Sequence, residues 1–563
     1  MAGAMTARAL ASYCLSVCIL EKGNDVALGA SRANSGIVHA GYDAREGTLK
    51  ARLNVRGSEI MEPLARELGV PYRRNGSLVT GFTPGDRDSI GTLYARGVKN
   101  GVRGLRILDG TQARQMEPGL SEKVTCALYA PSAAIICPYE LTIAAVGNAM
   151  DNGVELLTGF QVTDIKEKDG FFEILSASGA MKSLPDEGGD AVGRADSSCG
   201  RADSSCGSTD DPYDRTDSPC GRADSTCSST DNPCDSTDNP YDRTNSTYGN
   251  TDSPCGRTDN PCGRTNSTHN RKENKIYARY VVNAAGVHAD EIARMAGDFS
   301  FRIHPRRGEY MLLDRECGNL VSHTLFRTPS EKGKGVLITP TVDGNLLLGP
   351  TSQDLEDRGD TSVTAEGLEW IRNSALETLS SVPFHKTITS FCGLRAVGDT
   401  GDFILTSPRP GFINAAGIES PGLSAAPAIA ETVVEMLADQ GLPLRKKEDW
   451  NPIRRPAHAF RSASLEEKNR IIRRDKTYGR VVCRCETVTE GEILEAIRQN
   501  PPARDLDSVK RRTRAQMGRC QGGFCMPHIA ELLSRELDIP FEQVTKSGAG
   551  SEIIVGRTKE IMP

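Results

Sequence analysis

The chain has 563 residues, a formal net charge of −6 at neutral pH and a calculated isoelectric point near 5.9. This length allows about three or four domains, and the weakly acidic balance gives no electrostatic reason to expect binding to nucleic acid or to an anionic membrane. No uncharged apolar stretch reaches the roughly 18 residues of a membrane-spanning helix. No basic segment precedes the N-terminal apolar run, so a signal peptide is not expected either.

The first predicted elements are a helix over 2–13, a short strand over 15–20 and a turn that contains Glu21. In a dinucleotide-binding βαβ unit, a GxGxxG turn opens the helix and an acidic residue at the end of the second strand binds the ribose hydroxyls. Gly3 precedes Glu21 by 18 residues, which fits the last glycine of that turn. This order predicts that the first strand and the two earlier glycines would lie before Met1.

A repeat interrupts the connection between two predicted strands, 171–176 and 275–283. Residues 193–269 form eleven consecutive seven-residue units, such as GRADSSC and GRTDNPC, with almost no aliphatic side chains. A coiled-coil heptad needs two apolar positions and good helix formers, which these units lack, so the composition predicts a disordered insert. Seven of the 17 cysteines lie in the repeat, at separations that are multiples of seven. A metal-binding array is therefore the alternative interpretation of this segment.

Six sequence blocks outside the repeat share one order along the chain. They are GASRANSGIVHAGY (29–42), VVNAAGVHAD (281–290), PRRGEY (305–310), LITPTVDGNLLLGPT (337–351), FCGLRAVGDTGDF (391–403) and GIESPGLSAAPAIA (417–430). In this order they resemble the flavin-dependent oxidoreductases of the glycerol-3-phosphate dehydrogenase and D-amino-acid oxidase class. The resemblance implies an α/β fold, in which a Rossmann-like FAD-binding domain, its first strand missing at the N-terminus, is interleaved with an α+β substrate domain.

The resemblance also implies an FAD site made from the ribose carboxylate, a Ser/Asn-rich loop, a small-residue strand end and the start of the last helix. Small residues at the strand end allow close approach of the nucleotide, and free N–H groups at a helix start stabilise negative charge on the reduced flavin. The expected cofactor-binding residues are Gly3, Glu21, Ser31, Arg32, Asn34, Ser35, Ala285, Gly286, Gly393, Gly417, Ser420, Gly422 and Leu423.

Four residues are the candidates for the substrate site. Arg395 lies where members of the class place an arginine at the anionic group of the substrate, and a guanidinium suits bidentate binding of carboxylate or phosphate. His39 follows the flavin-wrapping loop and is the candidate base for the hydroxyl proton. Arg307 and Tyr310 are expected on the sheet that covers the flavin face. A surface arginine at 395 and a structural histidine at 39 are the simpler alternatives.

The spacing of the C-terminal cysteines indicates a metal or iron-sulfur site. Cys483 and Cys485 form C-x-C, Cys520 and Cys525 form C-x4-C, and 34 residues separate the two pairs. Four thiolates hold either zinc or a 2Fe-2S cluster, and zinc sites generally use C-x2-C pairs, so the spacing favours iron. This segment resembles the bacterioferritin-associated-ferredoxin-like domain, which implies a small helical fold around a 2Fe-2S cluster.

The predicted organisation is therefore an oxidoreductase over 1–440 with the insert at 193–269, a linker over 441–480, the cluster domain over 481–545 and a tail over 546–563. The resemblance implies oxidation of sn-glycerol 3-phosphate or a similar small 2-hydroxy acid by hydride transfer to FAD. Electrons would pass through the cluster to a partner flavoprotein or iron-sulfur subunit and on to a quinone. The expected location is the cytoplasm, with peripheral membrane association through a partner. The alternatives are an amino-acid or L-2-hydroxyglutarate dehydrogenase, and a non-catalytic electron-transfer subunit or truncated gene product.

Overall fold

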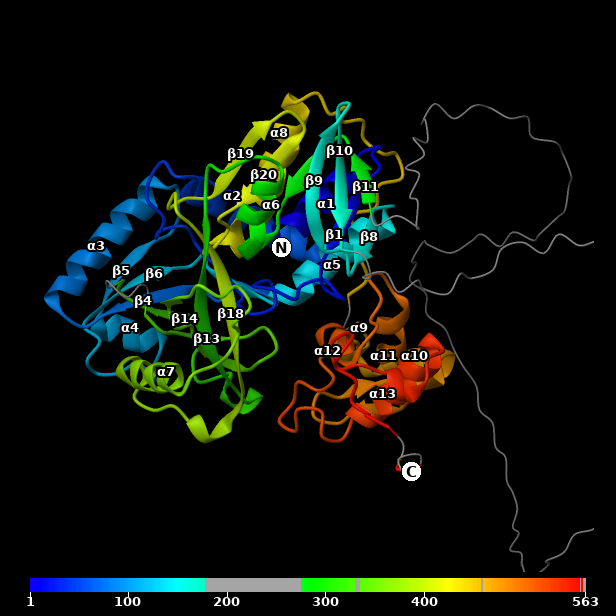
Figure 1. Ribbon diagram of the computed structural model, residues 1–563. Helices are drawn as coiled ribbons and strands as arrows, with labels where there is room; N and C mark the ends of the chain where they lie inside the picture. The colour runs from blue at the N-terminus through cyan, green and yellow to red at the C-terminus, as the bar shows by residue number, and fades with distance from the viewer. Residues whose placement is uncertain (178–274, 330–334, 457–458, 557, 560–563) are drawn as a thin grey trace, which may run out of the picture. The chain divides into compact units, whose positions relative to one another are not determined.

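The structure is a computed structural model that describes residues 1–177, 275–329, 335–456, 459–556 and 558–559 (Figure 1). The predicted disordered repeat and its alternative, a metal-binding array, lie outside the described residues. The strands that flank it pair antiparallel: β10 (Phe171–Ser176) and β11 (Lys275–Ala278) place Leu175 opposite Lys275. β9 (Val162–Lys168) completes this three-stranded sheet.

Two small parallel pairs form the strands of the predicted nucleotide-binding region. β1 (Cys18–Glu21) pairs with β8 (Glu155–Thr158), and β12 (Val281–Asn283) pairs with β20 (Phe412–Ala416), which also binds β19 (Ile404–Arg409). Three helices pack their alanine-rich or apolar faces on this region, because burying those faces removes apolar surface from water. They are α1 (Ala2–Ala11), α5 (Pro138–Asp151) and α8 (Gly422–Asp439).

Short elements connect this region to the rest of the fold. α2 (Leu49–Glu67) begins at Thr48, whose side chain accepts a hydrogen bond from the Ala51 N–H, as expected of a helix N-cap. α6 (Ala289–Met295) follows the 3-10 turn η1 (Gly286–His288). The antiparallel strands β2 (Ile37–Val38), β7 (Ala134–Ile136) and β3 (Tyr72–Arg73) form a further small sheet.

A nine-stranded mixed sheet carries the predicted substrate domain. Its central path is β17 (Gln353–Asp354), β13 (Ile303–Leu313), β16 (Leu346–Gly349), β15 (Leu337–Pro340), β14 (Thr324–Arg327), β4 (Ser77–Gly81), β6 (Cys126–Ala130) and β5 (Arg106–Asp109), with β18 (Thr387–Gly398) paired to β13. The helices beside it are α3 (Pro84–Lys99), α4 (Gly110–Met116) and α7 (Ala365–Thr378), and the short turns are η2 (Arg315–Cys317) and η3 (Phe384–Lys386) (Figure 1).

The C-terminal part is a small helical module with its own core. Its elements are α9 (Ala459–Ser462), α10 (Leu465–Arg474), η4 (Lys476–Gly479), β21 (Val481–Cys483), β22 (Val488–Thr489), α11 (Glu490–Arg498), α12 (Leu506–Thr513), α13 (Met526–Leu537) and η5 (Phe541–Gln543) (Figure 1). Capping boxes start α11 and α12, and their apolar faces join α13 in one cluster of buried residues. The predicted class, mixed α/β with a small helical C-terminal domain, is confirmed.

We use "flavin domain" for the described residues up to 439 and "cluster module" for residues 481–556. In the described ranges, no helix combines the length and the apolar composition that a bilayer span requires.

Candidate functional site

A large cavity of about 1950 Å³ opens in the flavin domain. It runs between β1 and β12 and reaches the first turn of α8 and the facing strands β13 and β18. The lining includes most of the predicted cofactor-binding residues, namely Gly3, Glu21, Ser31, Arg32, Asn34, Ser35, Ala285, Gly286, Gly393, Ser420, Gly422 and Leu423. Residues far apart in the sequence therefore meet around one space that is large enough for a dinucleotide. Gly417 lies outside the lining, beside Ile404.

Glu21 ends β1 at the edge of the cavity. Its Oε1 accepts a hydrogen bond of 2.8 Å from the Gly23 N–H, which holds the carboxyl group at the turn. Burial raises the pKa of Glu21, although the Gly23 N–H and nearby positive charges oppose that rise. A carboxyl group that is fixed and partly desolvated at a strand end can accept hydrogen bonds from ribose hydroxyls.

The Ser/Asn-rich loop is held by hydrogen bonds within the loop and by close packing against β18. The Asn34 side chain donates to the Ala30 carbonyl and accepts from the Gly36 N–H, each at 2.9 Å. Gly393 of β18 lies so close to Ala33 that a Cβ atom at position 393 would collide with the Ala33 backbone. Gly393 thus allows the sheet to pack against the loop, a close approach that any larger residue would prevent.

Gly286 presents backbone to the cavity. Its φ of +60° lies in the left-handed region, and a Cβ atom built there would meet nothing within 4 Å. A side chain at this position would be strained and would project into open space. Together with Glu21 and the loop, these features fit a nucleotide cofactor that approaches the backbone closely.

The substrate candidates lie on β13 and β18, which pair antiparallel with Arg306 opposite Arg395 and Tyr310 opposite Phe391. Side chains alternate between the two faces of a strand, so Arg306 and Tyr310 share the face of Arg395. All three line the cavity. Arg307 occupies the other face, where its buried guanidinium pairs with Asp360 and donates to Ser362 at 3.2 Å.

Arg395 has a guanidinium that is only partly satisfied. Its Nη2 donates to two backbone carbonyls, of Thr351 at 2.6 Å and of Arg307 at 2.9 Å. Its Nε is buried without a hydrogen-bond partner, and no ion pair to Arg395 occurs among the described residues. Burial lowers the pKa of Arg395. A desolvated guanidinium with free donors favours an anionic ligand.

His39 and Tyr310 also face this space. The His39 backbone N–H donates to Ser424 Oγ at 2.7 Å, and its ring lies 5.7 Å from the Phe326 ring. Tyr310 stacks on Phe391 with ring centroids 5.0 Å apart, and burial raises the pKa of Tyr310 to about 12. Tyr310 is therefore a neutral phenol at physiological pH.

Arg306 and Lys50 are among the cationic residues of the lining that were not expected from the sequence. Arg306 binds Asp354 through two hydrogen bonds, of 2.5 and 3.1 Å. Lys50 pairs with Glu419 at 2.8 Å. The two-residue alternation of a strand identifies Arg306 once Tyr310 is placed, whereas no local motif marks Lys50.

The four C-terminal cysteines converge in the cluster module. Cys483 and Cys525 are buried, Cys485 is exposed and Cys520 is partly exposed. The Sγ atoms of Cys485 and Cys520 lie 3.5 Å apart. A hydrogen bond from Cys525 lowers the pKa of Cys483 to about 6, and the same contact raises the pKa of Cys525. Thiolates are the form that binds iron, so the set fits a cluster with four cysteine ligands.

The loops that bring these thiols together contain residues with left-handed backbone conformations. Four residues other than glycine adopt φ values between 49° and 75°, namely Thr487, Arg514, Gln516 and Gln521. Such conformations are costly and concentrate where the surrounding structure fixes a functional site. The four left-handed residues in these loops agree with a backbone that is fixed to position the cysteine ligands.

Comparison with known families assigns both parts of the chain. Residues 1–183 and 256–436 match the family model described as FAD dependent oxidoreductase. Residues 481–535 match the BFD-like 2Fe-2S binding domain.

Individual relatives extend over most of the chain. A glycerol 3-phosphate dehydrogenase from Caloramator mitchellensis is 39% identical over 559 residues, which cover 99% of this chain and 97% of the relative. A glycerol 3-phosphate oxidase from Mycoplasma genitalium is 25% identical and covers 80% of this chain and 94% of its own length.

Solved structures share the fold. The dithionite-reduced L-alpha-glycerophosphate oxidase from Mycoplasma pneumoniae with FAD bound has a TM-score of 0.61 at 23% identity, over 80% of this chain and 95% of that one. The glycerol-3-phosphate dehydrogenase from Bacillus halodurans complexed with FAD has a TM-score of 0.56 at 15% identity, over 96% and 89%.

Proposed function

This chain belongs to the family of FAD-dependent oxidoreductases, with FAD and a 2Fe-2S cluster as its cofactors, and on that premise we propose that its substrate is sn-glycerol 3-phosphate. The reaction oxidises the secondary hydroxyl of the substrate to a ketone. When bound, FAD accepts two electrons as hydride, and the cluster transfers electrons one at a time. Residues of the chain bind the substrate and remove the proton of its hydroxyl group.

The observation that carries this proposal is the unpaired guanidinium of Arg395. It lines the cavity, its Nε is buried without a partner and its other contacts are to neutral carbonyl oxygens. A phosphate group supplies the negative charge and the acceptor oxygens that this guanidinium lacks. The relative that is 39% identical carries the name glycerol 3-phosphate dehydrogenase, which supports phosphate over carboxylate.

His39 is the proposed base for the substrate hydroxyl. It lines the same cavity as Arg395, and the hydrogen bond from its N–H to Ser424 fixes its backbone beside α8. Proton removal by a positioned imidazole contributes about 10²- to 10⁴-fold to such reactions. Tyr310, neutral and stacked on Phe391, is proposed to shape the wall next to Arg395.

The proposed route for electrons leads out through the cluster module. Cys485 is exposed and Cys520 is partly exposed, so one edge of the cluster site lies near the surface. Phe524, between Cys520 and Cys525, is 87% exposed. A partner flavoprotein or iron-sulfur subunit, and a quinone beyond it, remain the proposed acceptors, and a cytoplasmic location remains a prediction.

Substrate oxidation tests the proposal directly. We would purify the protein anaerobically, load it with FAD, and follow flavin bleaching and dye reduction with sn-glycerol 3-phosphate, L-2-hydroxyglutarate, glycine and L-proline. We expect bleaching with sn-glycerol 3-phosphate and little with the others. Bleaching by an amino acid alone would contradict the proposal and favour an amino-acid dehydrogenase. Bleaching by none of them, in protein that contains FAD, would favour a non-catalytic electron-transfer subunit.

A further inference from the structure

The two pairs of cluster ligands are held in different ways. Cys483 and Cys525 are 1% and 2% exposed and belong to the core of the cluster module, together with residues of α11 and α13. Cys485 and Cys520 lie on outer loops and have no place in that core. The core of the module therefore fixes the inner pair, whereas the outer pair lies on loops outside that core.

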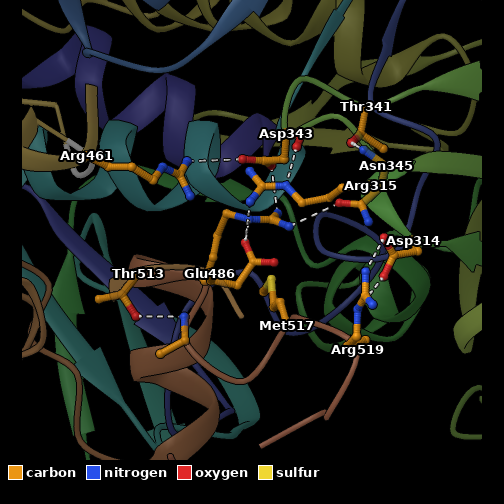
Figure 2. Close-up of polar contacts among 12 residues, drawn as sticks. Asp314, Arg315, Thr341, Asp343, Asn345, Arg461, Glu486, Thr513, Met517 and Arg519 are labelled. Atoms are coloured by element: carbon orange, nitrogen blue, oxygen red, sulfur yellow. Dashed lines mark hydrogen bonds and ion pairs between the residues drawn. The ribbon is translucent and has the colours of Figure 1, made fainter. Parts of the chain in front are cut away.

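Each outer ligand has a charged neighbour in the sequence that contacts the flavin domain. Arg519 precedes Cys520, and its guanidinium lies 3.2 Å from the Asp314 carboxylate (Figure 2). The same guanidinium lies 3.0 Å from the Glu316 carboxylate. Glu486 follows Cys485, and its carboxylate lies 3.5 Å from the Arg315 guanidinium. The residues that flank the outer ligands thus meet three consecutive residues of the flavin domain.

The signs of these charges alternate in a complementary way. Residues 314–316 read acid, base, acid, while the cluster loops present Arg519 to the two acids and Glu486 to the base. Arg315 is itself fixed, since its Nε donates to the Asp343 carbonyl at 2.8 Å. A shift of either loop would separate opposite charges and bring like charges together.

Arg514, which is buried, also contacts Glu486 and Asp343. Its Nε donates to Glu486 at 3.0 Å and its Nη1 donates to Asp343 at 2.7 Å. Glu486 and Arg514 are each under 5% exposed, so separating them would leave two buried charges without partners, which is strongly unfavourable. Figure 2 shows Glu486 and Asp343 facing each other across this network, with Arg461 also paired to Asp343.

We propose that residues 314–316 of the flavin domain act as a clamp that positions the outer cluster ligands, Cys485 and Cys520, through Glu486 and Arg519. Arg315 and Arg519 are positioning residues in this arrangement, because they contact the neighbours of the ligands and not the cluster. The inference goes beyond the proposed function and rests on the 2Fe-2S site alone, whatever the substrate is. Retention of the cluster then depends on contact with the flavin domain.

Charge reversal at Arg519 tests the clamp. Arg519→Glu places a carboxylate against Asp314 and Glu316, and Arg315→Ala removes the cation opposite Glu486. We expect each variant to lose its cluster to a chelator roughly fivefold faster than wild type, the size expected from one or two partly exposed ion pairs. Cluster loss is followed by visible absorbance and iron content, and the geometry by electron paramagnetic resonance of the dithionite-reduced protein. Arg519→Lys, which keeps the charge, should restore most of the wild-type rate.

Arg484 provides the matched control. It also neighbours Cys485 and is exposed, but it forms no ion pair among the described residues. Arg484→Glu changes the charge beside the cluster equally and should leave the loss rate near that of wild type. Equal acceleration in Arg484→Glu and Arg519→Glu, or wild-type rates and spectra in both clamp variants, would overturn the clamp. Absence of iron from the anaerobically purified wild type would overturn the 2Fe-2S premise, and neither result depends on the substrate assay.

Discussion

At the scale of single residues, the alternation of one strand decides which arginine can meet the substrate. Arg306 and Arg307 are neighbours on β13, yet only Arg306 faces the cavity with Arg395 and Tyr310. Arg306 already binds Asp354 through two hydrogen bonds, whereas Arg395 has no carboxylate partner in the described part of the chain. Arg395 is therefore the residue on which binding of an anionic substrate should depend most.

We predict that Arg395→Met raises the KM for sn-glycerol 3-phosphate about 10- to 100-fold, because a charge-assisted hydrogen bond contributes roughly 1.5–3 kcal/mol. Steady-state dye reduction measures this change. Arg302→Met is the matched control, since Arg302 is exposed just before the same β13 strand and should keep the wild-type KM. An Arg395→Met enzyme with an unchanged KM would show that the anion binds elsewhere.

At the scale of elements, the turn after β1 contacts both the cofactor cavity and the cluster module. Glu21 and Gly23 lie at the cavity, while Asp25, two residues further, is buried against α12 of the cluster module. Arg512 donates two hydrogen bonds of 2.8 Å to Asp25, and Arg511 adds a third of 2.6 Å. A turn that lines the cavity is thus tied to the cluster module by a desolvated ion pair.

Burial by itself raises the pKa of Asp25, but the hydrogen bonds and charges of Arg512 and Arg511 outweigh it and leave the pKa below its ordinary value of 3.8. A carboxyl group with a lowered pKa in the folded state stabilises that state above the ordinary value. The stabilisation is lost as the pH falls through the lowered pKa. The contribution of Asp25 should therefore be constant from neutral pH to about pH 5 and decline below about pH 4.

We predict that Asp25→Asn lowers the free energy of unfolding by about 3–5 kcal/mol at pH 7, because two buried arginines lose their carboxylate. Thermal melts of wild type and variant between pH 7 and pH 3 measure the effect, and the difference in melting temperature should shrink at the acid end. Asp88→Asn, an exposed change on α3, should melt as wild type throughout. A difference that stays the same down to pH 3 would contradict the assignment of this pH dependence to Asp25.

At the scale of the whole molecule, one chain carries two cofactor sites that differ in the number of electrons their cofactors accept. The cavity of the flavin domain fits a two-electron cofactor, and the four thiols of the cluster module fit a one-electron cofactor. The contacts of Asp25 with Arg512, and of residues 314–316 with Glu486 and Arg519, join the two parts.

We predict that anaerobic titration with dithionite takes up about three electrons per wild-type chain, two at FAD and one at the cluster. Cys485→Ser should take up about two, because a lost thiolate ligand removes the cluster while the flavin domain keeps its own core. Cys14→Ser changes a thiol outside the cluster set, whose hydrogen bond goes to the Lys446 carbonyl, so this variant is the control and should behave as wild type. Equal electron uptake by wild type and Cys485→Ser would exclude Cys485 as a required ligand.

Local patterns were sufficient for much of this organisation. Thiol spacing predicts the four cluster cysteines, and the place of Glu21 at the end of a short strand, 18 residues after Gly3, predicts that it binds the ribose. Each pattern depends on residues close in sequence. The assignment of Gly3 to a GxGxxG turn remains a prediction. Arg307, expected beside the flavin, instead lies on the opposite face of β13, because neighbouring side chains of a strand point to opposite faces.

The sequence by itself determined the chemistry that this protein carries: a flavin-type fold, a set of cluster thiols and the order of the two along the chain. Only the tertiary structure decided which charges meet, such as Asp25 with Arg512, 487 residues apart, and Arg315 with Glu486. The physical reason is that ligand spacing is a local property of the backbone. Ion pairing instead depends on distances of a few ångströms, which only folding establishes between segments remote in sequence.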